Sequence, residues 1–355
     1  MKNFILIAGL MFSFSMTAQT KVVKMNAVKS NNFGVAYSLP LTTFTIDAEV
    51  TKITSKAGPY YKYAEKYLGV KDVITEDKVV FQLDKVTLEN KGIPDKENSY
   101  MVEFKSGTTA PFVYLTEEGL ICSINAEVDE SIFSADSTKK KKVVPAGINS
   151  ASVLSEELLM AGSTAKQAEV AAKQIYRIRE SRLNILTGEA DNLPPDGDAM
   201  KLVIEQLEQQ EKALTNLFTG VVTKESLQKQ FTIQPTGNME KEILFRFSEL
   251  MGIVDADNLG GTPVYINLTA TEKAPVLEPK EAEKKLKNMK GIIYNLPGKA
   301  TIEIKMNNKT LYQGEHQVTQ FGSQESLAPS MFEDKKAPVK VYFYPQTGAI
   351  KQIIQ

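Results

Sequence analysis

The sequence predicts an α+β protein with two related β-sandwich-like or barrel-like units and a central antiparallel α-helical hairpin. Apolar residues alternate with polar ones near both ends of the chain, and they recur every three or four positions over residues 164–218. A short sequence pattern also recurs in both β regions. We expect residues 19–150 to form an N-terminal β domain, residues 151–219 the helical hairpin, and residues 220–355 a C-terminal β domain.

The first residues of the chain have the features of a secretory signal peptide. Lys2 supplies a positive charge, residues 4–14 are an apolar run, and small or polar residues follow. A membrane-spanning helix needs about 20 apolar residues, so this run is short for one. We expect a signal peptide at residues 1–18, cleaved between Ala18 and Gln19. The alternatives are a buried N-terminal helix or an uncleaved anchor.

The first half of the mature chain is expected to be mainly β. From Thr43 to Ile53 apolar and polar residues alternate, as in a strand with one buried face. Turn residues separate further strand-like runs, and residues 60–69 (YYKYAEKYLG) indicate a short helix that ends at a glycine. The tyrosines of this helix could dock it on its sheet or form an aromatic platform for a sugar. The further runs cover residues 79–88, 100–104, 112–115 and 120–124.

Two helices of about 22 residues are expected in the middle of the chain. The prolines within residues 191–195 prevent one continuous helix, so the two should form an antiparallel hairpin. Basic residues on the first helix and acidic residues on the second favour this docking. The expected apolar seam consists of Ala168, Ala171, Ile175, Ile178 and Ile185 with Arg182 in one position, facing Met200, Val203, Leu207, Leu214 and Leu217 with Gln210 in one position.

Strand patterns return after Gly220, interrupted by one short amphipathic helix over residues 281–289. The expected strands cover residues 231–233, 243–247, 264–268, 301–305 and 339–344.

An internal repeat links the two β regions. Residues 34–40 read GVAYSLP and residues 291–297 read GIIYNLP, and each segment precedes a strand pattern. The end segments 113–124 and 342–353 align without gaps. Chance similarity is the alternative, but the matched ends favour two copies of one β unit. The repeat signature consists of Gly34, Tyr37, Leu39 and Pro40, and of Gly291, Tyr294, Leu296 and Pro297.

The chain resembles a family of secreted Bacteroides-type proteins of unknown function, DUF4831. The resemblance rests on GVAYSLP, on residues 58–74 and 175–197, and on GIIYNLPGKA with the QFG of residues 320–322. It covers nearly the whole mature chain. It implies an envelope or extracellular location in a gut-type or anaerobic bacterium, and it supplies no catalytic residues.

Composition excludes several classes of protein. The chain has 42 basic and 43 acidic residues, so there is no excess of positive charge for nucleic acid. No second long apolar run predicts a transmembrane segment in the mature chain. The single cysteine, Cys122, cannot form an internal disulfide and does not follow the signal as a lipid-anchored cysteine would.

No residue pattern identifies a catalytic, cofactor or metal site. His316 is the only histidine, and no nucleophile motif accompanies it. One histidine and one cysteine cannot complete a zinc site. Residues 255–261 begin like a calcium loop, but Leu259 and Ile266 occupy positions that need oxygen ligands. No phosphate-binding glycine loop occurs.

We therefore expect an exported, non-enzymatic structural or binding protein of the bacterial cell envelope, located in the periplasm or at the cell exterior. Its partner would be an envelope protein or a glycan, and the sequence leaves the oligomeric state open. The alternative is a carboxylate-dependent hydrolase acting on glycan or peptidoglycan. Two close carboxylates with raised pKa in a deep pocket would favour the hydrolase, whereas an exposed apolar surface would favour the binding protein.

Overall fold

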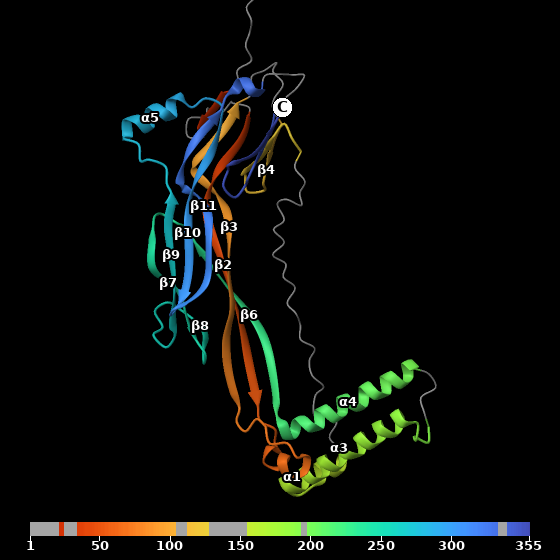
Figure 1. The fold of residues 1–355 in the computed structure, drawn as a ribbon. Helices are drawn as coiled ribbons and strands as arrows, with labels where there is room; N and C mark the ends of the chain where they lie inside the picture. Colours follow the sequence, from red (N-terminus) through yellow and green to blue (C-terminus); the bar gives the residue numbers. More distant parts are fainter. Residues whose placement is uncertain (1–20, 25–33, 104–111, 128–154, 193–196, 333–338) are drawn as a thin grey trace, which may run out of the picture.

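The computed structural model describes residues 21–24, 34–103, 112–127, 155–192, 197–332 and 339–355. The expected signal peptide, Ala18 and Gln19 lie outside these residues. The described chain is a mixed α and β protein with more strand than helix. Figure 1 shows an elongated molecule, with most strands at one end and two long helices at the other.

The longest strands form the first sheet. β2 (Gly34–Lys56) and β3 (Lys78–Glu103) make one long antiparallel hairpin. β6 (Val221–Ile233) pairs with β2 without interruption from Phe44 to Lys56, and β1 (Lys21–Lys24) pairs with the end of β3. Beyond Val50, β2, β3 and β6 continue toward the helices, and we call this part of the sheet the ribbon (Figure 1).

The second sheet has the order β11-β10-β9-β7-β8 and contains the second long hairpin. This hairpin is made by β10 (Ile292–Met306) and β11 (Lys309–Leu327). The other strands are β7 (Met239–Ser248), β8 (Gly252–Val254) and β9 (Thr262–Glu272).

The third sheet joins two short hairpins that follow the two long ones in the sequence. β4 (Val113–Leu115) and β5 (Ile121–Ile124) form one, and β12 (Lys340–Phe343) and β13 (Ile350–Ile354) form the other. β5 and β12 pair with each other, so the two halves of the chain share this sheet. A short 3₁₀ helix, η5 (Pro329–Phe332), lies between β11 and β12.

Two apolar cores hold the strands, and each core takes residues from both halves of the chain. The first lies between the first and second sheets and includes Phe44, Ile46, Phe245 and Ile302. The second is formed where the third sheet meets the ends of the long hairpins, and we call this region the head. The domain boundaries expected from the sequence stay a prediction. Buried head residues include Tyr37, Leu39, Tyr100, Val102, Ile121, Ile292, Ile293 and Val341.

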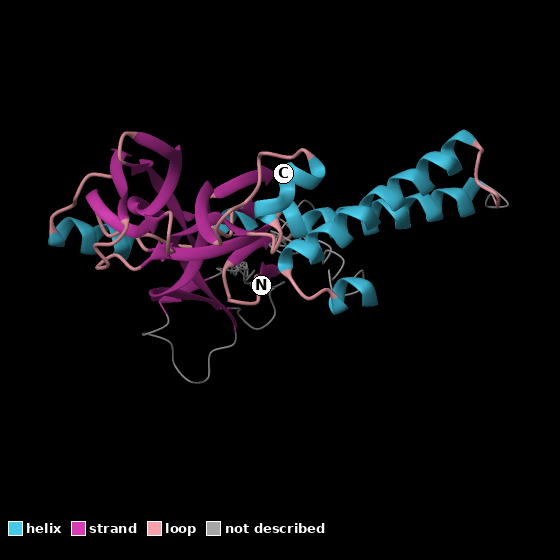
Figure 2. Ribbon diagram, turned by 90° about the horizontal axis from the view of Figure 1, so that it is seen from below, coloured by secondary structure: helices cyan, strands magenta, loops and turns pink. Residues whose placement is uncertain are grey.

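The described helices that precede β6 in the sequence occupy the opposite end of the ribbon. α3 (Thr164–Thr187) and α4 (Gly197–Thr219) lie side by side, and α4 runs into β6 through Gly220. Seen from below in Figure 2, this pair projects away from the strands. The shorter helices are α2 (Glu156–Met160) before α3, and η2 (Tyr61–Tyr63) with α1 (Ala64–Leu68) between β2 and β3.

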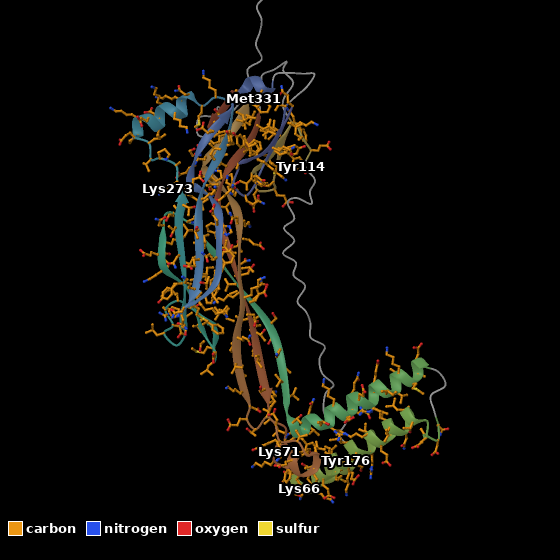
Figure 3. The ribbon with its side chains drawn as sticks, viewed as in Figure 1. Lys66, Lys71, Tyr114, Tyr176, Lys273 and Met331 are labelled. Atoms are coloured by element: carbon orange, nitrogen blue, oxygen red, sulfur yellow. The ribbon has the colours of Figure 1, made fainter. Side chains whose placement is uncertain are left out.

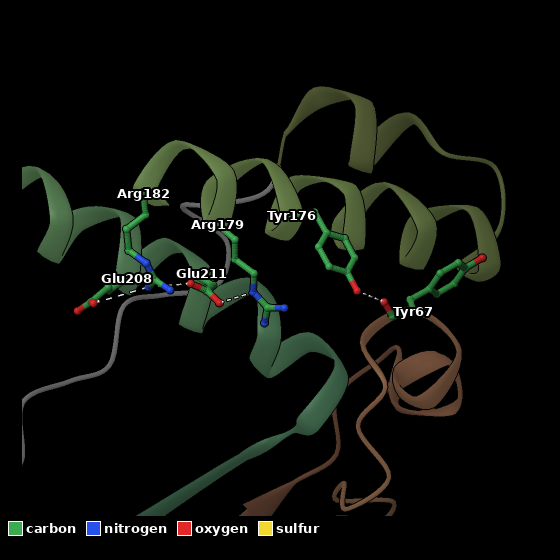
Figure 4. A network of polar contacts seen from close by, with 6 residues as sticks. All are labelled: Tyr67, Tyr176, Arg179, Arg182, Glu208 and Glu211. Atoms are coloured by element: carbon green, nitrogen blue, oxygen red, sulfur yellow. Dashed lines mark hydrogen bonds and ion pairs between the residues drawn. The ribbon is translucent and has the colours of Figure 1, made fainter. Parts of the chain in front are cut away.

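The seam between α3 and α4 differs in part from the expected one. Val203 is 38% exposed and Gln210 is exposed, whereas Ile204 and Glu211 are half-buried. The physical reason is electrostatic, because Glu211 accepts a hydrogen bond from Arg179 (2.6 Å) and pairs with Arg182 (2.9 Å). Figure 4 shows these pairs crossing between the helices. Met200, Leu207, Leu214 and Leu217 keep their expected places, so the seam differs only where Ile204 and Glu211 replace Val203 and Gln210.

The short tyrosine-rich helix packs on the helical pair. Tyr60 is buried against Phe218, with ring centroids 5.5 Å apart. Tyr63 and Tyr67 pack on the same core, and the hydroxyl of Tyr176 donates to the Tyr67 carbonyl oxygen at 2.7 Å (Figure 4). The expectation that these tyrosines dock the helix on its sheet was wrong, because the apolar surface that they cover belongs to α3 and α4. None of the described helices is long and apolar enough to cross a membrane.

Candidate binding groove

The repeat signature lies at equivalent backbone positions in the two long hairpins. GVAYSLP begins β2 and GIIYNLP begins β10. The residue after each tyrosine donates its N–H to a glycine carbonyl of the following short hairpin: Ser38 to Gly119 at 2.9 Å, and Asn295 to Gly348 at 3.1 Å. Both glycines have positive φ, at 84° and 67°. The two signatures therefore meet the two short hairpins in the same way.

The leucine–proline step of each signature lies at a large β-bulge. In the first hairpin Ser38 pairs with Ser99 and Pro40 with Pro94, so residues 95–98 loop out opposite one residue of β2. In the second hairpin Leu296 pairs with Ser323 and Gly298 with Val318, so residues 319–322 loop out opposite one residue of β10. Each proline thus marks a step at which four residues bulge from the partner strand.

The side chains of the two signatures differ in environment. Tyr37 is 2% exposed, and its hydroxyl donates to the Ile293 carbonyl oxygen (3.1 Å) and accepts from the Ile293 N–H (2.9 Å). Tyr294 is only half-buried. Leu39 is buried, whereas Leu296 is 45% exposed. The backbone settings are therefore alike, while the tyrosine and leucine of the first signature are more deeply buried than those of the second.

Both bulges line a groove of about 650 Å³ at the base of the head. The opposite wall is made by α5 (Pro279–Asn288) and the segment that leads to it from β9, which passes Lys273 in Figure 3. The lining contains no aromatic side chain. It consists of Leu39, Pro40, Leu41, Asp95, Asn98, Ala274, Pro275, Leu277, Ala282, Glu283, Lys285, Met289, Asn295, Thr319, Gln320, Gly322, Ser323 and Gln324.

The second bulge is fixed across the two sheets by side chains that imitate a strand pairing. The Gln320 amide accepts from the Thr42 N–H (3.2 Å) and donates to the Thr42 carbonyl oxygen (2.8 Å). The hydroxyl of Thr42, in turn, accepts from the Thr319 N–H at 3.0 Å. Because Thr42 is fully buried, these bonds satisfy backbone groups that water does not reach. The groove is thereby built on a rigid floor.

Carboxylates at the groove are already engaged. Asp95 accepts from the Glu97 N–H and from the Asn98 side chain, which closes the first bulge. Glu283 pairs with Lys287 at 2.7 Å. At the rim, Glu325 pairs with Lys285 at 2.6 Å, and this ion pair links α5 to β11. This arrangement favours a structural role for these side chains over acid–base chemistry.

Other reactive side chains lie outside the groove. His316 is half-buried against Phe44, its Nε2 lies 2.6 Å from the Tyr312 hydroxyl, and burial lowers its pKa. Cys122 is buried in the head, where burial raises its pKa to about 12. Within the described ranges, no three or more histidine, cysteine, aspartate or glutamate side chains converge as metal ligands would.

The sequence predicted no groove, although some of the groove residues belong to patterns that were singled out. Leu39, Pro40 and the QFG segment were noticed for their pattern, but Asn295, Asn98 and Gln324 were not singled out. The sequence did offer a reason to single out Asn295, because it stands in GIIYNLP where GVAYSLP has Ser38. Nothing in the sequence places Asn98 or Gln324 at the groove, since both positions follow from the strand register.

These features define a strand-rich α+β protein of two long β-hairpins, with a groove where they meet. The model of a family described as a domain of unknown function, DUF4831, matches residues 33–351, and the chain belongs to this family. No curated protein and no solved structure matches the chain.

Proposed function

We propose that the protein is an exported, non-enzymatic binding or structural protein of the bacterial cell envelope, and that the α3–α4 pair is its partner surface. The observation that carries this proposal is the exposure of Leu183, Leu186 and Leu202, at 59%, 62% and 58%. All three lie on the half of the pair that is far from the ribbon. Exposed groups of large apolar side chains mark surfaces for other macromolecules.

The near half of the pair supports this reading, because it has its own core. Ala168, Ile175, Leu214 and Phe218 are buried there. The far half has no comparable core among the described residues. There α3 and α4 are joined by the ion pairs of Arg182 with Glu208 and Glu211. A helical pair with one packed half and one exposed apolar half is suited to dock a partner at its tip.

The proposal includes an origin by duplication, with each copy made of one long and one short β-hairpin. The shared leucine–proline bulges and the matching hydrogen bonds to Gly119 and Gly348 support it. A hydrolase is less favoured, because the groove carboxylates Asp95 and Glu283 already have partners.

Affinity capture from the envelope fraction of the native cell tests the partner surface. The test variant carries Leu183→Ser, Leu186→Ser and Leu202→Ser. The matched control carries Leu250→Ser, Leu259→Ser and Val276→Ser, which are 71%, 83% and 91% exposed elsewhere. We expect the test variant to lose a partner that the wild type and the control retain. Equal capture by all three proteins, with unchanged helix content, would remove the helical pair as the partner surface.

Cell fractionation with N-terminal sequencing tests export. The protein should be found outside the inner membrane and begin at Gln19. Recovery of the full-length chain from the cytoplasm alone would contradict this part of the proposal.

A further inference from the structure

The groove floor carries a hydrogen-bond acceptor that the fold holds in place. Asn295 is 5% exposed, and its Nδ2 donates to the carbonyl oxygens of Pro40 (3.1 Å) and Thr347 (3.0 Å). Carbonyl oxygens only accept, so these two bonds fix which end of the amide is nitrogen. The Oδ1 atom accepts no hydrogen bond from the described residues and is not among their fully enclosed atoms. Since Asn295 lines the groove, this oxygen faces it.

A donor lies beside this acceptor. Gln324 is the direct pairing partner of Asn295 between β10 and β11, so the two side chains are neighbours on one face of the sheet. The Oε1 atom of Gln324 accepts from the Tyr100 hydroxyl at 3.1 Å, which leaves Nε2 as a donor without a partner in the described chain. Tyr100 is 3% exposed, and burial raises its pKa to about 12, so the hydroxyl keeps its proton over the physiological range.

We propose that the groove binds an extended peptide segment of another protein. A backbone N–H of the segment donates to Asn295 Oδ1, and a nearby backbone carbonyl accepts from Gln324 Nε2. Gln320 already uses its amide in this way on the backbone of Thr42 at the edge of the same groove. This inference goes beyond the partner surface on the helical pair and does not depend on it.

The walls favour a peptide over a sugar. Leu277 and Met289 provide apolar contacts for the side chains of a peptide. Sugar sites usually offer an aromatic ring on which the sugar stacks, and this lining has none. The volume of about 650 Å³ lies in the range of ordinary ligand sites and holds a short segment only.

The groove is also able to admit a chain from outside. No described side chain of α5 is buried, and α5 is joined to β11 by the Lys285–Glu325 pair, whose side chains are 34% and 40% exposed. Exposed pairs of this kind contribute little to stability. A segment could therefore enter between α5 and the head without breaking a core.

Selection from a phage-displayed library of random 12-residue peptides on the purified protein tests the proposal. The affinity of each selected peptide is then measured by fluorescence anisotropy on two groove variants. Gln324→Glu removes the donor but keeps the acceptor for Tyr100, and Ala282→Trp fills the groove from α5. The controls are Gln313→Glu on the exposed part of β11 and Lys284→Trp on α5, both outside the lining.

We expect the selected peptides to bind Gln324→Glu about tenfold more weakly and Ala282→Trp more weakly still, with both controls unchanged. Tenfold corresponds to about 1.4 kcal/mol, which is of the size of one hydrogen bond. The proposal is overturned if no peptide is enriched or if the groove variants bind as the wild type does. Oligomers of N-acetylglucosamine carry the same amide group, and their binding in place of peptides would also overturn it.

Discussion

The hydroxyl of Tyr37 connects the two halves of the chain at the backbone of Ile293, whereas the hydroxyl of Tyr294 has no such bond among the described residues. Tyr37→Phe keeps the ring but leaves the buried N–H and C=O of Ile293 without their partner. We expect the free energy of unfolding to fall by about 1–3 kcal/mol. Tyr294→Phe, at the matching position of the other copy, should change it by less than about 0.5 kcal/mol. Urea unfolding measures both, and equal effects would contradict the assigned asymmetry.

Tyr100 should make the head sensitive to alkali. Its pKa is raised by burial from 10.0 to about 12, and burial also raises the pKa of Tyr37. A raised pKa means that the folded state holds the proton more tightly than the unfolded state, so the contribution to stability is complete below pH 10 and is lost between pH 10 and pH 12. Urea midpoints across this window should fall less steeply for Tyr100→Phe than for the wild type. Parallel curves would show that Tyr100 ionises as freely in the folded protein.

Single residues were predicted where a local pattern determines them. The alternation that starts at Thr43 places Phe44, Ile46, Ala48 and Val50 in the core, as expected. The environment of Tyr37 could not be predicted, because its partner Ile293 is 256 residues away. The acidic residues of the second helix, Glu211 among them, were expected to face the basic first helix, and the pairs of Glu211 with Arg179 and Arg182 agree with this. The position of Glu211 in the seam was not expected, since a hydrophobic pattern gives no weight to a carboxylate.

At the scale of elements, the bulge of residues 319–322 depends on a glycine. A Cβ added at Gly322 would lie 1.9 Å from the Leu296 carbonyl oxygen. A side chain at this position would therefore push the bulge away from β10. We expect Gly322→Ala to lower the free energy of unfolding by at least about 2 kcal/mol. Gly237→Ala, where a Cβ meets nothing within 4 Å, is the control and should change it little. Comparable stability of the two variants in urea would argue against the tight bulge.

The periodicity of apolar residues predicted most helices and strands, but it did not predict their lengths. Residues 301–305 were expected as one strand, and β10 runs from Ile292 to Met306. The proline in GIIYNLP argued for a strand that starts after it, because proline interrupts a ladder. The bulge resolves this conflict by letting the pairing step past Pro297 and continue. Almost all of the 13 residues of β6 are exposed, so they show no hydrophobic alternation. Only the last three, residues 231–233, were predicted as a strand.

At the scale of the whole molecule, the ribbon makes the protein long. A compact chain of this length would have a radius of gyration of about 20 Å. We expect small-angle X-ray scattering to give a clearly larger value, because the helical pair lies at the far end of the ribbon from the head (Figure 1). Removal of residues 57–77 and 155–220 together should shorten the longest dimension. A value near that of a compact chain would mean that the helices fold back on the strands.

The arrangement of whole sheets could not be predicted from the sequence. The mixed α and β class followed from the change of period, and the repeat pointed to hairpins that begin alike. The pairing of β5 with β12 and the cores shared by both halves depend on contacts far apart in the chain, for which no local pattern exists. The groove is also lined by residues from both halves of the chain, which is why no local motif predicted it.

The ribbon also determines how the two ends would respond to a pulling force. Among the described residues, three strands leave the sheets and enter the helical end: β2, β3 and β6. Within the ribbon, β2 and β6 pair from Thr51 to Lys56, a length of about 20 Å. Tension between the ends is therefore carried by at least these three covalent segments in parallel, and hydrogen bonds are needed only to keep them aligned. Such a link would stay intact under loads that unfold a spacer made of one chain.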